Sequence, residues 1–210
     1  MSRKLKALGL ALIAVFAMAA ISAATASAEE LFHSSEAHSI IRGTQVAEDT
    51  FTVNAGTVKC KKATYNGTSS ATTVKEQRVK PTYSECTAFG FVNTTIDVPS
   101  SCEYLFTQPV AKVGKVDIVG CLEPITVTGF NCWVTVGNQN NLGSITYTTG
   151  ESLKAHDLLI HVSLTGITYT QHSKSFPGCT AGTFTNGTYT GTSTVEALNT
   201  AGEPIPLTLE

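Results

Sequence analysis

Short runs of strand-forming residues, separated by turn-forming residues, dominate this chain. After residue 28, runs rich in Val, Ile, Thr, Tyr and Phe alternate with Gly, Asn and Pro every 8–15 residues, and helix-forming patterns are nearly absent. This pattern is typical of an all-β antiparallel sandwich or barrel. The predicted strands cover residues 38–46, 50–53, 56–65, 71–79, 86–92, 102–108, 112–119, 125–136, 143–149, 157–170, 182–196 and 205–209.

The first 28 residues have the layout of a bacterial secretory signal peptide. Three basic residues precede an apolar stretch over residues 7–21, and Ala26-Ser27-Ala28 provides a small-residue cleavage site. The apolar stretch is shorter than the roughly 20 residues that a membrane-spanning helix needs. We therefore predict that residues 1–28 are removed and that residues 29–210 form a single all-β extracellular domain, which does not span the membrane.

The charge of the exported chain argues against nucleic acid as a partner. Removing Arg3, Lys4 and Lys6 from the 14 basic residues leaves 11, against 16 acidic residues, for a net charge of −5. Binding to the phosphate backbone requires clustered positive charge, and the exported chain has an excess of negative charge.

Six cysteines in an exported chain predict a domain stapled by disulfides. The cysteines are Cys60, Cys86, Cys102, Cys121, Cys132 and Cys179. Fifteen connectivities are open to six cysteines, and a chain of sequential hairpins favours near neighbours, which gives Cys60–Cys86, Cys102–Cys121 and Cys132–Cys179. No C-x-x-C pair is present to begin a zinc site, so we predict no metal site and no cofactor.

Side chains alternate between the two faces of a strand, which predicts several positions. Tyr147 shares a face with Ile145, and Tyr169 shares one with Ile167, so these tyrosines are expected in the core. In the strand over 157–170, Ile160 and Val162 are expected to be buried and His161 to be exposed. The dipeptides Asn66-Gly67 and Asn186-Gly187 predict type I′ hairpin turns.

Four cysteine-containing segments, over residues 51–60, 81–86, 101–106 and 117–121, carry a resemblance. Together these segments resemble the secreted, cysteine-bearing β-proteins of actinobacteria, and the resemblance covers most of residues 29–210. It implies an extracellular location and an all-β fold, and it carries no activity over to this chain.

The sequence contains no catalytic signature. No serine lies in a G-x-S-x-G context. His156 and His161 are five residues apart and face opposite sides of one strand, so they cannot chelate together. The carboxylates between residues 76 and 123 are scattered: Glu76, Glu85, Asp97, Glu103, Asp117 and Glu123. A glycosidase needs two carboxylates on either side of one bond, and only three dimensions could bring two together.

The candidate binding residue is Trp133. Cys132, Val134 and Val136 are expected to face the core, which places Trp133 on the outer face beside Thr135. An exposed indole suits stacking on a sugar ring or on a partner's apolar patch. We therefore predict a non-catalytic binding or structural module of the cell envelope or extracellular space, with envelope polysaccharide or another surface protein as its partner. The alternative is a secreted glycosidase-like hydrolase.

Overall fold

The computed structural model describes residues 31–107, 109–129, 131–149, 157–174 and 178–210. Within these residues the chain forms fifteen β-strands and no helix, which confirms the predicted all-β class. The predicted signal peptide and His156 lie outside the described residues. A search of the described residues finds no helix with the length and apolar character of a membrane span.

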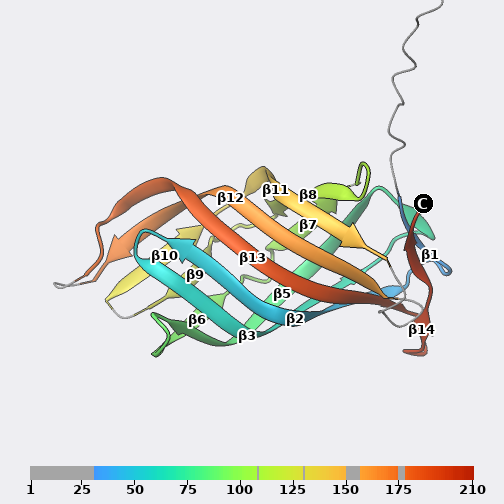
Figure 1. The fold of residues 1–210 in the computed structure, drawn as a ribbon, viewed down its shortest axis with the longest axis horizontal. Helices are drawn as coiled ribbons and strands as arrows, with labels where there is room; N and C mark the ends of the chain where they lie inside the picture. The colour runs from blue at the N-terminus through green and yellow to red at the C-terminus, as the bar shows by residue number, and fades with distance from the viewer. Residues whose placement is uncertain (1–30, 108, 130, 150–156, 175–177) are drawn as a thin grey trace, which may run out of the picture.

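Five long strands form the continuous wall of a barrel (Figure 1). Each strand in this wall is antiparallel to its neighbours. Their order is β12 (Leu158–Ser173), β13 (Gly182–Leu198), β2 (Ile40–Val53), β3 (Gly56–Thr68) and β5 (Glu76–Ala88).

Two sets of three short strands close this wall. One set is β6 (Val92–Asp97), β9 (Ile125–Thr128) and β10 (Cys132–Val136). The other set is β7 (Glu103–Thr107), β8 (Val113–Val119) and β11 (Gln139–Thr148). Each set bridges β5 and β12 and so completes an eight-stranded antiparallel ring with the long strands. Of the two predicted architectures, the structure is therefore the barrel, and its two ends share five strands.

A small separate sheet lies at one end of the barrel. In it, β1 (Phe32–Ser34) lies between β15 (Leu207–Leu209) and β4 (Thr73–Val74), while β14 (Pro204–Ile205) pairs with the last residues of β13. The ring of Phe32 packs edge to face on Tyr147 of β11, with centroids 5.4 Å apart. We call this the capped end. The turns of the β6-β9-β10 set lie at the opposite end, which we call the far end (Figure 1).

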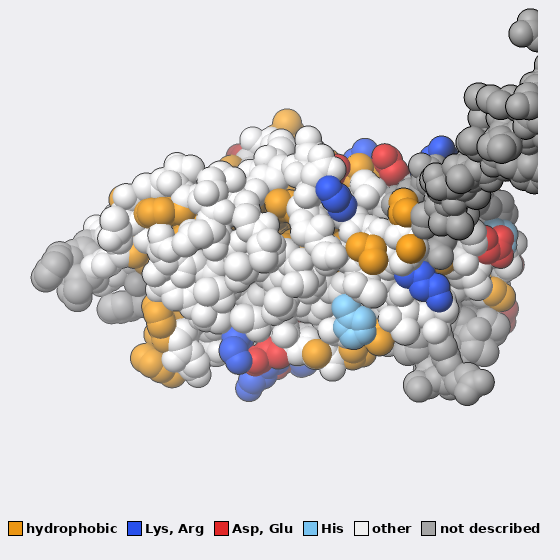
Figure 2. All heavy atoms as spheres, turned by 45° about the horizontal axis from the view of Figure 1, so that its top comes forward, with side chains coloured by type: hydrophobic (Ala, Val, Ile, Leu, Met, Phe, Trp, Pro, Cys, Tyr) orange, Lys and Arg blue, Asp and Glu red, His pale blue; other side chains and the backbone are white. Residues whose placement is uncertain are grey.

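Alternating apolar side chains fill the barrel, as predicted. Tyr147 and Tyr169 are almost fully buried, which confirms the predicted direction of both side chains. Ile160 is buried and His161 is exposed, as expected, whereas Val162 is only half-buried. The outer wall is rich in threonine, and the face drawn in Figure 2 has few charged side chains.

Two predicted strand breaks are wrong. The predicted strands at 38–46 and 50–53 form one strand, β2, whose pairing with β3 shifts between Thr44 and Asp49. The predicted strands at 71–79 and 86–92 are joined in β5, which runs through the fully buried Pro81. Proline lacks a backbone N–H and is excluded from positions that need two ladder partners. Pro81 is tolerated because β5 pairs with β7 only up to Val79 and with β6 only from Cys86.

The two predicted Asn-Gly hairpin turns are also wrong. Asn66 and Gly67 lie within β3, and Asn186 and Gly187 lie within β13. A Cβ on Gly67 would collide with the carbonyl oxygen of Arg78 on β5. Close approach of a neighbouring strand, rather than a turn, therefore accounts for this glycine.

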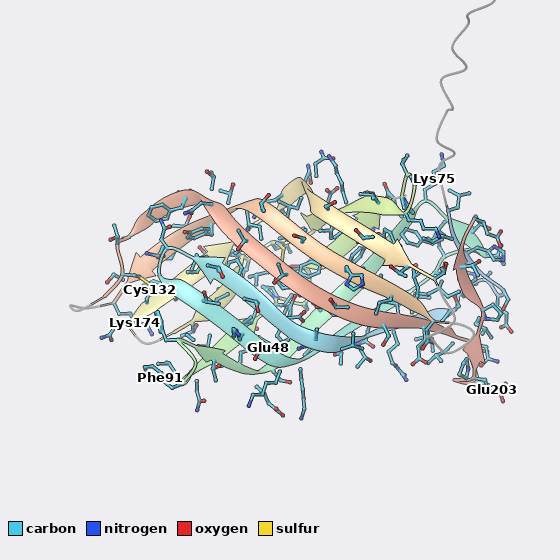
Figure 3. The ribbon with its side chains drawn as sticks, viewed as in Figure 1. Glu48, Lys75, Phe91, Cys132, Lys174 and Glu203 are labelled. Atoms are coloured by element: carbon cyan, nitrogen blue, oxygen red, sulfur yellow. A yellow bond between two sulfur atoms is a disulfide. The ribbon has the colours of Figure 1, made fainter. Side chains whose placement is uncertain are left out.

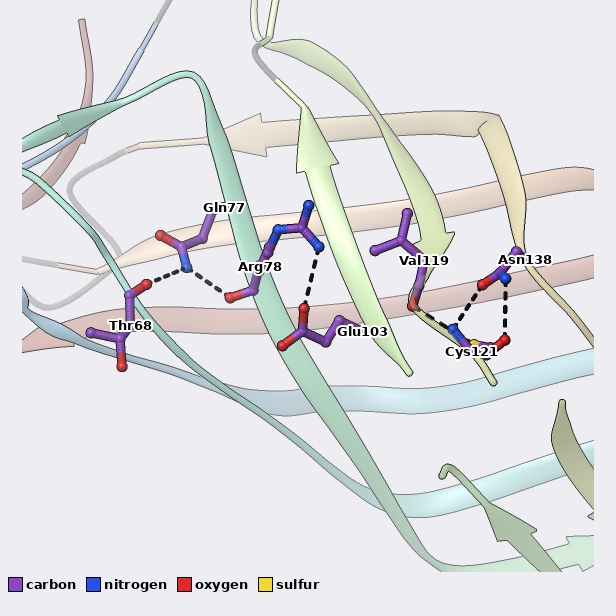
Figure 4. A network of polar contacts seen from close by, with 7 residues as sticks. All are labelled: Thr68, Gln77, Arg78, Glu103, Val119, Cys121 and Asn138. Atoms are coloured by element: carbon purple, nitrogen blue, oxygen red, sulfur yellow. Dashed lines mark hydrogen bonds and ion pairs between the residues drawn. The ribbon is translucent and has the colours of Figure 1, made fainter. Parts of the chain in front are cut away.

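The Asn138 amide and a disulfide join connections between the two sets of short strands, and the Gln139 amide joins β11 to β12. The Cys102–Cys121 disulfide links two of the connections between the sets. Asn138 lies in a third connection, and its amide accepts a hydrogen bond from the Cys121 N–H (2.9 Å) and donates to the Cys121 carbonyl (3.2 Å) (Figure 4). The amide of Gln139 makes the same two bonds to the backbone of Thr168, at 2.7 and 2.8 Å. These side-chain amides make hydrogen bonds to the backbone at positions where the long strands change from pairing with one set of short strands to pairing with the other.

The predicted disulfides are confirmed in all three pairings. Cys60 and Cys86 lie directly opposite each other on β3 and β5. Cys132, at the start of β10, bonds to Cys179, which precedes β13 at the far end. Such bonds are consistent with an oxidising extracellular compartment.

Candidate functional site

A hollow of about 570 Å³ lies at the far end of the barrel. Its lining comes from the β2–β3 and β5–β6 turns, from β9 and β10, and from the residues that precede β13. This volume falls within the range of about 300–1,000 Å³ that is typical of small-molecule sites. The far end therefore contains a space large enough for a ligand.

Apolar side chains form most of the wall of this far-end hollow. Phe51, Val53 and Val58 reach it from β2 and β3, and Val127 and Val134 reach it from β9 and β10. All five are buried. They occupy inward positions because side chains alternate along each strand. The hollow can accordingly hold the apolar body of a ligand.

One buried polar group in the far-end hollow lacks a partner. Gln171 is 2% exposed and lines the hollow from β12. Its Nε2 donates a hydrogen bond of 2.6 Å to the carbonyl of Thr180, while its Oε1 has no hydrogen-bond partner. A buried acceptor without a partner costs about 1–3 kcal/mol. Because Oε1 has almost no accessible surface, a ligand in the hollow reaches it only when the Gln171 side chain turns toward the space.

Two exposed phenylalanines lie at the turn between β5 and β6. Phe89 is 58% exposed and Phe91 is 81% exposed. The Phe89 ring lies against Gly56, where a Cβ would collide with it, and it contributes to the lining of the hollow. Phe91 projects from the same end of the molecule (Figure 3). Aromatic surface therefore continues from the hollow to the outside of the barrel.

Trp133 lies half-buried on the outer wall of β10, beside the hollow rather than in it. Its indole stacks on the imidazole of His172, with centroids 4.8 Å apart and planes at 7°. The Lys174 ammonium lies 5.8 Å from the indole centroid. The predicted outward direction agrees with burial of Val134 and Val136, and one face of the ring is already occupied by His172. A ligand role for Trp133 stays a prediction.

A second, inner cavity of about 120 Å³ lies within the barrel. Four tyrosines contribute to its otherwise mostly apolar lining: Tyr65, Tyr83, Tyr104 and Tyr189. Their hydroxyls pair with one another, Tyr65 with Tyr189 at 2.8 Å and Tyr83 with Tyr104 at 3.1 Å. Desolvation by burial raises the pKa of each of these hydroxyls. They therefore remain neutral phenols at physiological pH.

Asp49 is the one buried charged residue among the described residues, at 2% exposure. Its Oδ2 accepts a 3.0 Å hydrogen bond from the Tyr65 hydroxyl, and its Oδ1 has no hydrogen-bond partner. Burial raises the pKa of the carboxyl to about 6, although hydrogen bonds from Tyr65 and Tyr189 act in the opposite direction. Asp49 is adjacent to Gly191, where a Cβ would collide with Oδ1. The packing around Asp49 thus requires a glycine on β13.

Several other acidic side chains form ion pairs on the exposed surface. Glu48 pairs with Lys59 and Glu103 pairs with Arg78, at 3.0 and 3.3 Å (Figure 4 shows the second pair). Glu85 pairs with Lys62. Within the described ranges, no three His, Cys, Asp or Glu side chains are grouped so that they could hold a metal ion. Glu48, Glu85 and Glu103 are thus each paired with a basic side chain on the surface.

Neither Gln171 nor the Asp49–tyrosine cluster is among the residues predicted from the sequence. A usable signal was present for Asp49, because it has the same strand parity as Phe51 and Val53, and a charged residue in phase with a core face is unusual. Gln171 is two residues from Tyr169 and four from Ile167, so its side chain is expected on the same inward face of the strand. Neither signal shows that the neighbouring space is hollow.

Comparison with known proteins returns no relative. No protein-family model matches the chain, and no curated protein and no solved structure matches it.

Proposed function

We propose that the chain is an exported bacterial binding module, without catalytic activity, whose far-end hollow takes a small and mostly apolar molecule. The observation that carries the proposal is the mostly apolar hollow of about 570 Å³, which has the buried side chain of Gln171 in its lining. An apolar hollow with a few placed polar groups is the usual form of a small-molecule site. The three disulfides and the predicted signal peptide support an extracellular location.

The surroundings of the hollow favour binding over catalysis. Gln171 is the buried polar side chain in its lining that has a free acceptor, and an amide is neither an acid nor a base at ordinary pH. Asp49, the buried carboxyl, is not part of the lining. Holding an apolar ligand requires mainly apolar contact, which the lining of this hollow supplies.

The experiment is a fluorescence titration with N-phenyl-1-naphthylamine, an apolar dye with one N–H donor. We expect saturable binding to one site, with an increase in dye fluorescence as it leaves water. Val53→Phe fills part of the hollow and should weaken binding at least tenfold. Val46→Phe, at an exposed position on the same strand, is the matched control and should leave binding unchanged.

Circular dichroism and thermal unfolding establish that each variant is folded before it is titrated. Absence of saturable dye binding by the folded wild-type protein would refute the proposal. Equal weakening by Val53→Phe and Val46→Phe would also refute it, because the dye would then be bound elsewhere on the barrel.

A further inference from the structure

The far-end hollow and the inner cavity share part of their walls. Phe51 and Val127 line both spaces. Phe51 comes from the long wall, and Val127 comes from β9 in the short set. These two side chains therefore form a partition, and a ligand that displaces them would occupy both spaces along the barrel.

The two spaces differ in polarity. The far-end hollow includes polar residues, among them Asn54, Thr94 and Gln171. The inner cavity is lined mainly by aliphatic and aromatic side chains, and the hydroxyls of its tyrosines pair with one another. A molecule that extends through both would gain most with its polar group in the far-end hollow and an apolar group in the inner cavity.

We infer that the ligand is a single-chain amphiphile, with a hydrogen-bond-donating head at Gln171 and an aliphatic tail that passes between Phe51 and Val127 into the inner cavity. The inference rests on the proposed function and names its ligand class. A donor is required because the unpartnered atom of Gln171 is the acceptor Oε1, while Nε2 is bonded to Thr180. Oε1 is buried, so the Gln171 side chain turns toward the hollow when the head binds.

The dimensions favour a narrow tail. The inner cavity, at about 120 Å³, is slightly smaller than the dry apolar cavity of about 150 Å³ that accommodates benzene. It can therefore take the last few carbons of one chain but no fused ring system. The path between two side chains, Phe51 and Val127, imposes the same restriction on the part of the tail that crosses the partition.

The test is displacement of N-phenyl-1-naphthylamine by straight-chain 1-alkanols from hexanol to tetradecanol. Each methylene that becomes buried should tighten binding about fourfold, until the tail fills the inner cavity. Val127→Phe thickens the partition, so it should weaken dodecanol at least tenfold more than it weakens hexanol, although Val127 also lines the far-end hollow. Val46→Phe is the matched control and should change neither.

The head is tested with a second pair of probes. Gln171→Leu should weaken 1-dodecanol about tenfold and leave the methyl ether of the same chain, which has no donor, nearly unchanged. Phe51→Leu serves as an independent test of the partition, because a smaller side chain should favour the longer alkanols without emptying the core.

The outcomes separate the inference from the proposed function. If the dye and hexanol bind but dodecanol binds no more tightly, the tail inference is wrong while the far-end site stands. If the ether and the alkanol respond equally to Gln171→Leu, the assignment of the head is wrong. If neither dye nor alkanol binds, both the inference and the proposed function fail.

Discussion

The two ends of the barrel share five strands but differ in what fills them. At the capped end, a three-stranded sheet places Phe32 against Tyr147, and apolar contact closes the interior. At the far end, turns surround a hollow, and Phe91 is exposed beside it. The difference shows that closing an eight-stranded ring does not determine whether its end is packed. The added β1, β4 and β15 provide the packing at the capped end.

The largest expected effect on stability comes from removing a phenylalanine, and it should differ between the two ends of the barrel. Phe32→Ala deletes a buried ring from the capped end and should destabilise the protein by about 3–5 kcal/mol. Phe91→Ala removes an 81% exposed ring from the far end and should change stability by less than about 0.5 kcal/mol. Urea unfolding measures both. Similar losses at the two positions would contradict the difference between the ends.

The next effect concerns pH and the carboxyl between the ends. Burial raises the pKa of the Asp49 carboxyl from its ordinary value of 3.8 to about 6, so the folded state binds the proton more tightly than the unfolded state. Its contribution to stability is therefore full below pH 4, declines as pH rises to 6, and levels off above that. The loss is on the order of 3 kcal/mol.

Asp49→Asn should remove this decline, so the stability difference between wild type and variant should change between pH 4 and pH 7. Glu48→Gln is the matched control, because Glu48 precedes Asp49 and is exposed in its pair with Lys59. Urea unfolding at several pH values gives the comparison. A constant difference between wild type and Asp49→Asn would show that the carboxyl has an ordinary pKa.

A smaller difference in stability is expected between leucine substitutions of two buried glutamines. Gln77, on β5, donates through Nε2 to the carbonyls of Thr68 and Arg78, at 3.4 and 2.8 Å (Figure 4). Gln77→Leu should cost about 1–3 kcal/mol because it removes these donors. Gln171→Leu also removes a donor, but it removes an unpartnered acceptor as well, so its cost should be below about 1 kcal/mol. A larger loss for Gln171→Leu would mean that Oε1 is satisfied in solution.

The smallest effect concerns Trp133. Its stack on His172 should contribute about 0.5–1.5 kcal/mol, which a double-mutant cycle of Trp133→Ala and His172→Ala measures. Acrylamide should quench the half-buried indole in the folded protein, and His172→Ala should increase that quenching by exposing a ring face. Complete protection from the quencher in both proteins would place the indole in the core.

Features that depend on local chemistry were predictable from the sequence. Alternation placed Tyr147 and Tyr169 in the core, and nearest-neighbour pairing gave the three disulfides. The failures occur where long-range pairing overrides a local signal. Pro81 would break an ordinary central strand, but the neighbouring strands part at that position. Gly67 would suit a turn, but the backbone of β5 approaches it closely.

The candidate site was predictable only in part. The inward parity of Gln171 and Asp49 could be read from the sequence, since both are in phase with core residues. The hollow itself depends on how eight strands close and on which end receives a cap, and both depend on contacts between residues far apart in the chain. Trp133 was selected because it is the single tryptophan and lies at an outward position. Neither property indicates where a hollow lies.

The most direct test of the central claim is a two-dimensional ¹H–¹⁵N spectrum of the protein titrated with N-phenyl-1-naphthylamine. We expect saturable shifts for amides around the far-end hollow, such as Gly56, Thr94 and Thr180, and for the side-chain amide of Gln171. Phe32 and Tyr147 at the capped end should remain unshifted. Shifts concentrated at the capped end, or spread over the outer wall without saturation, would contradict the claim that the far end is the binding site.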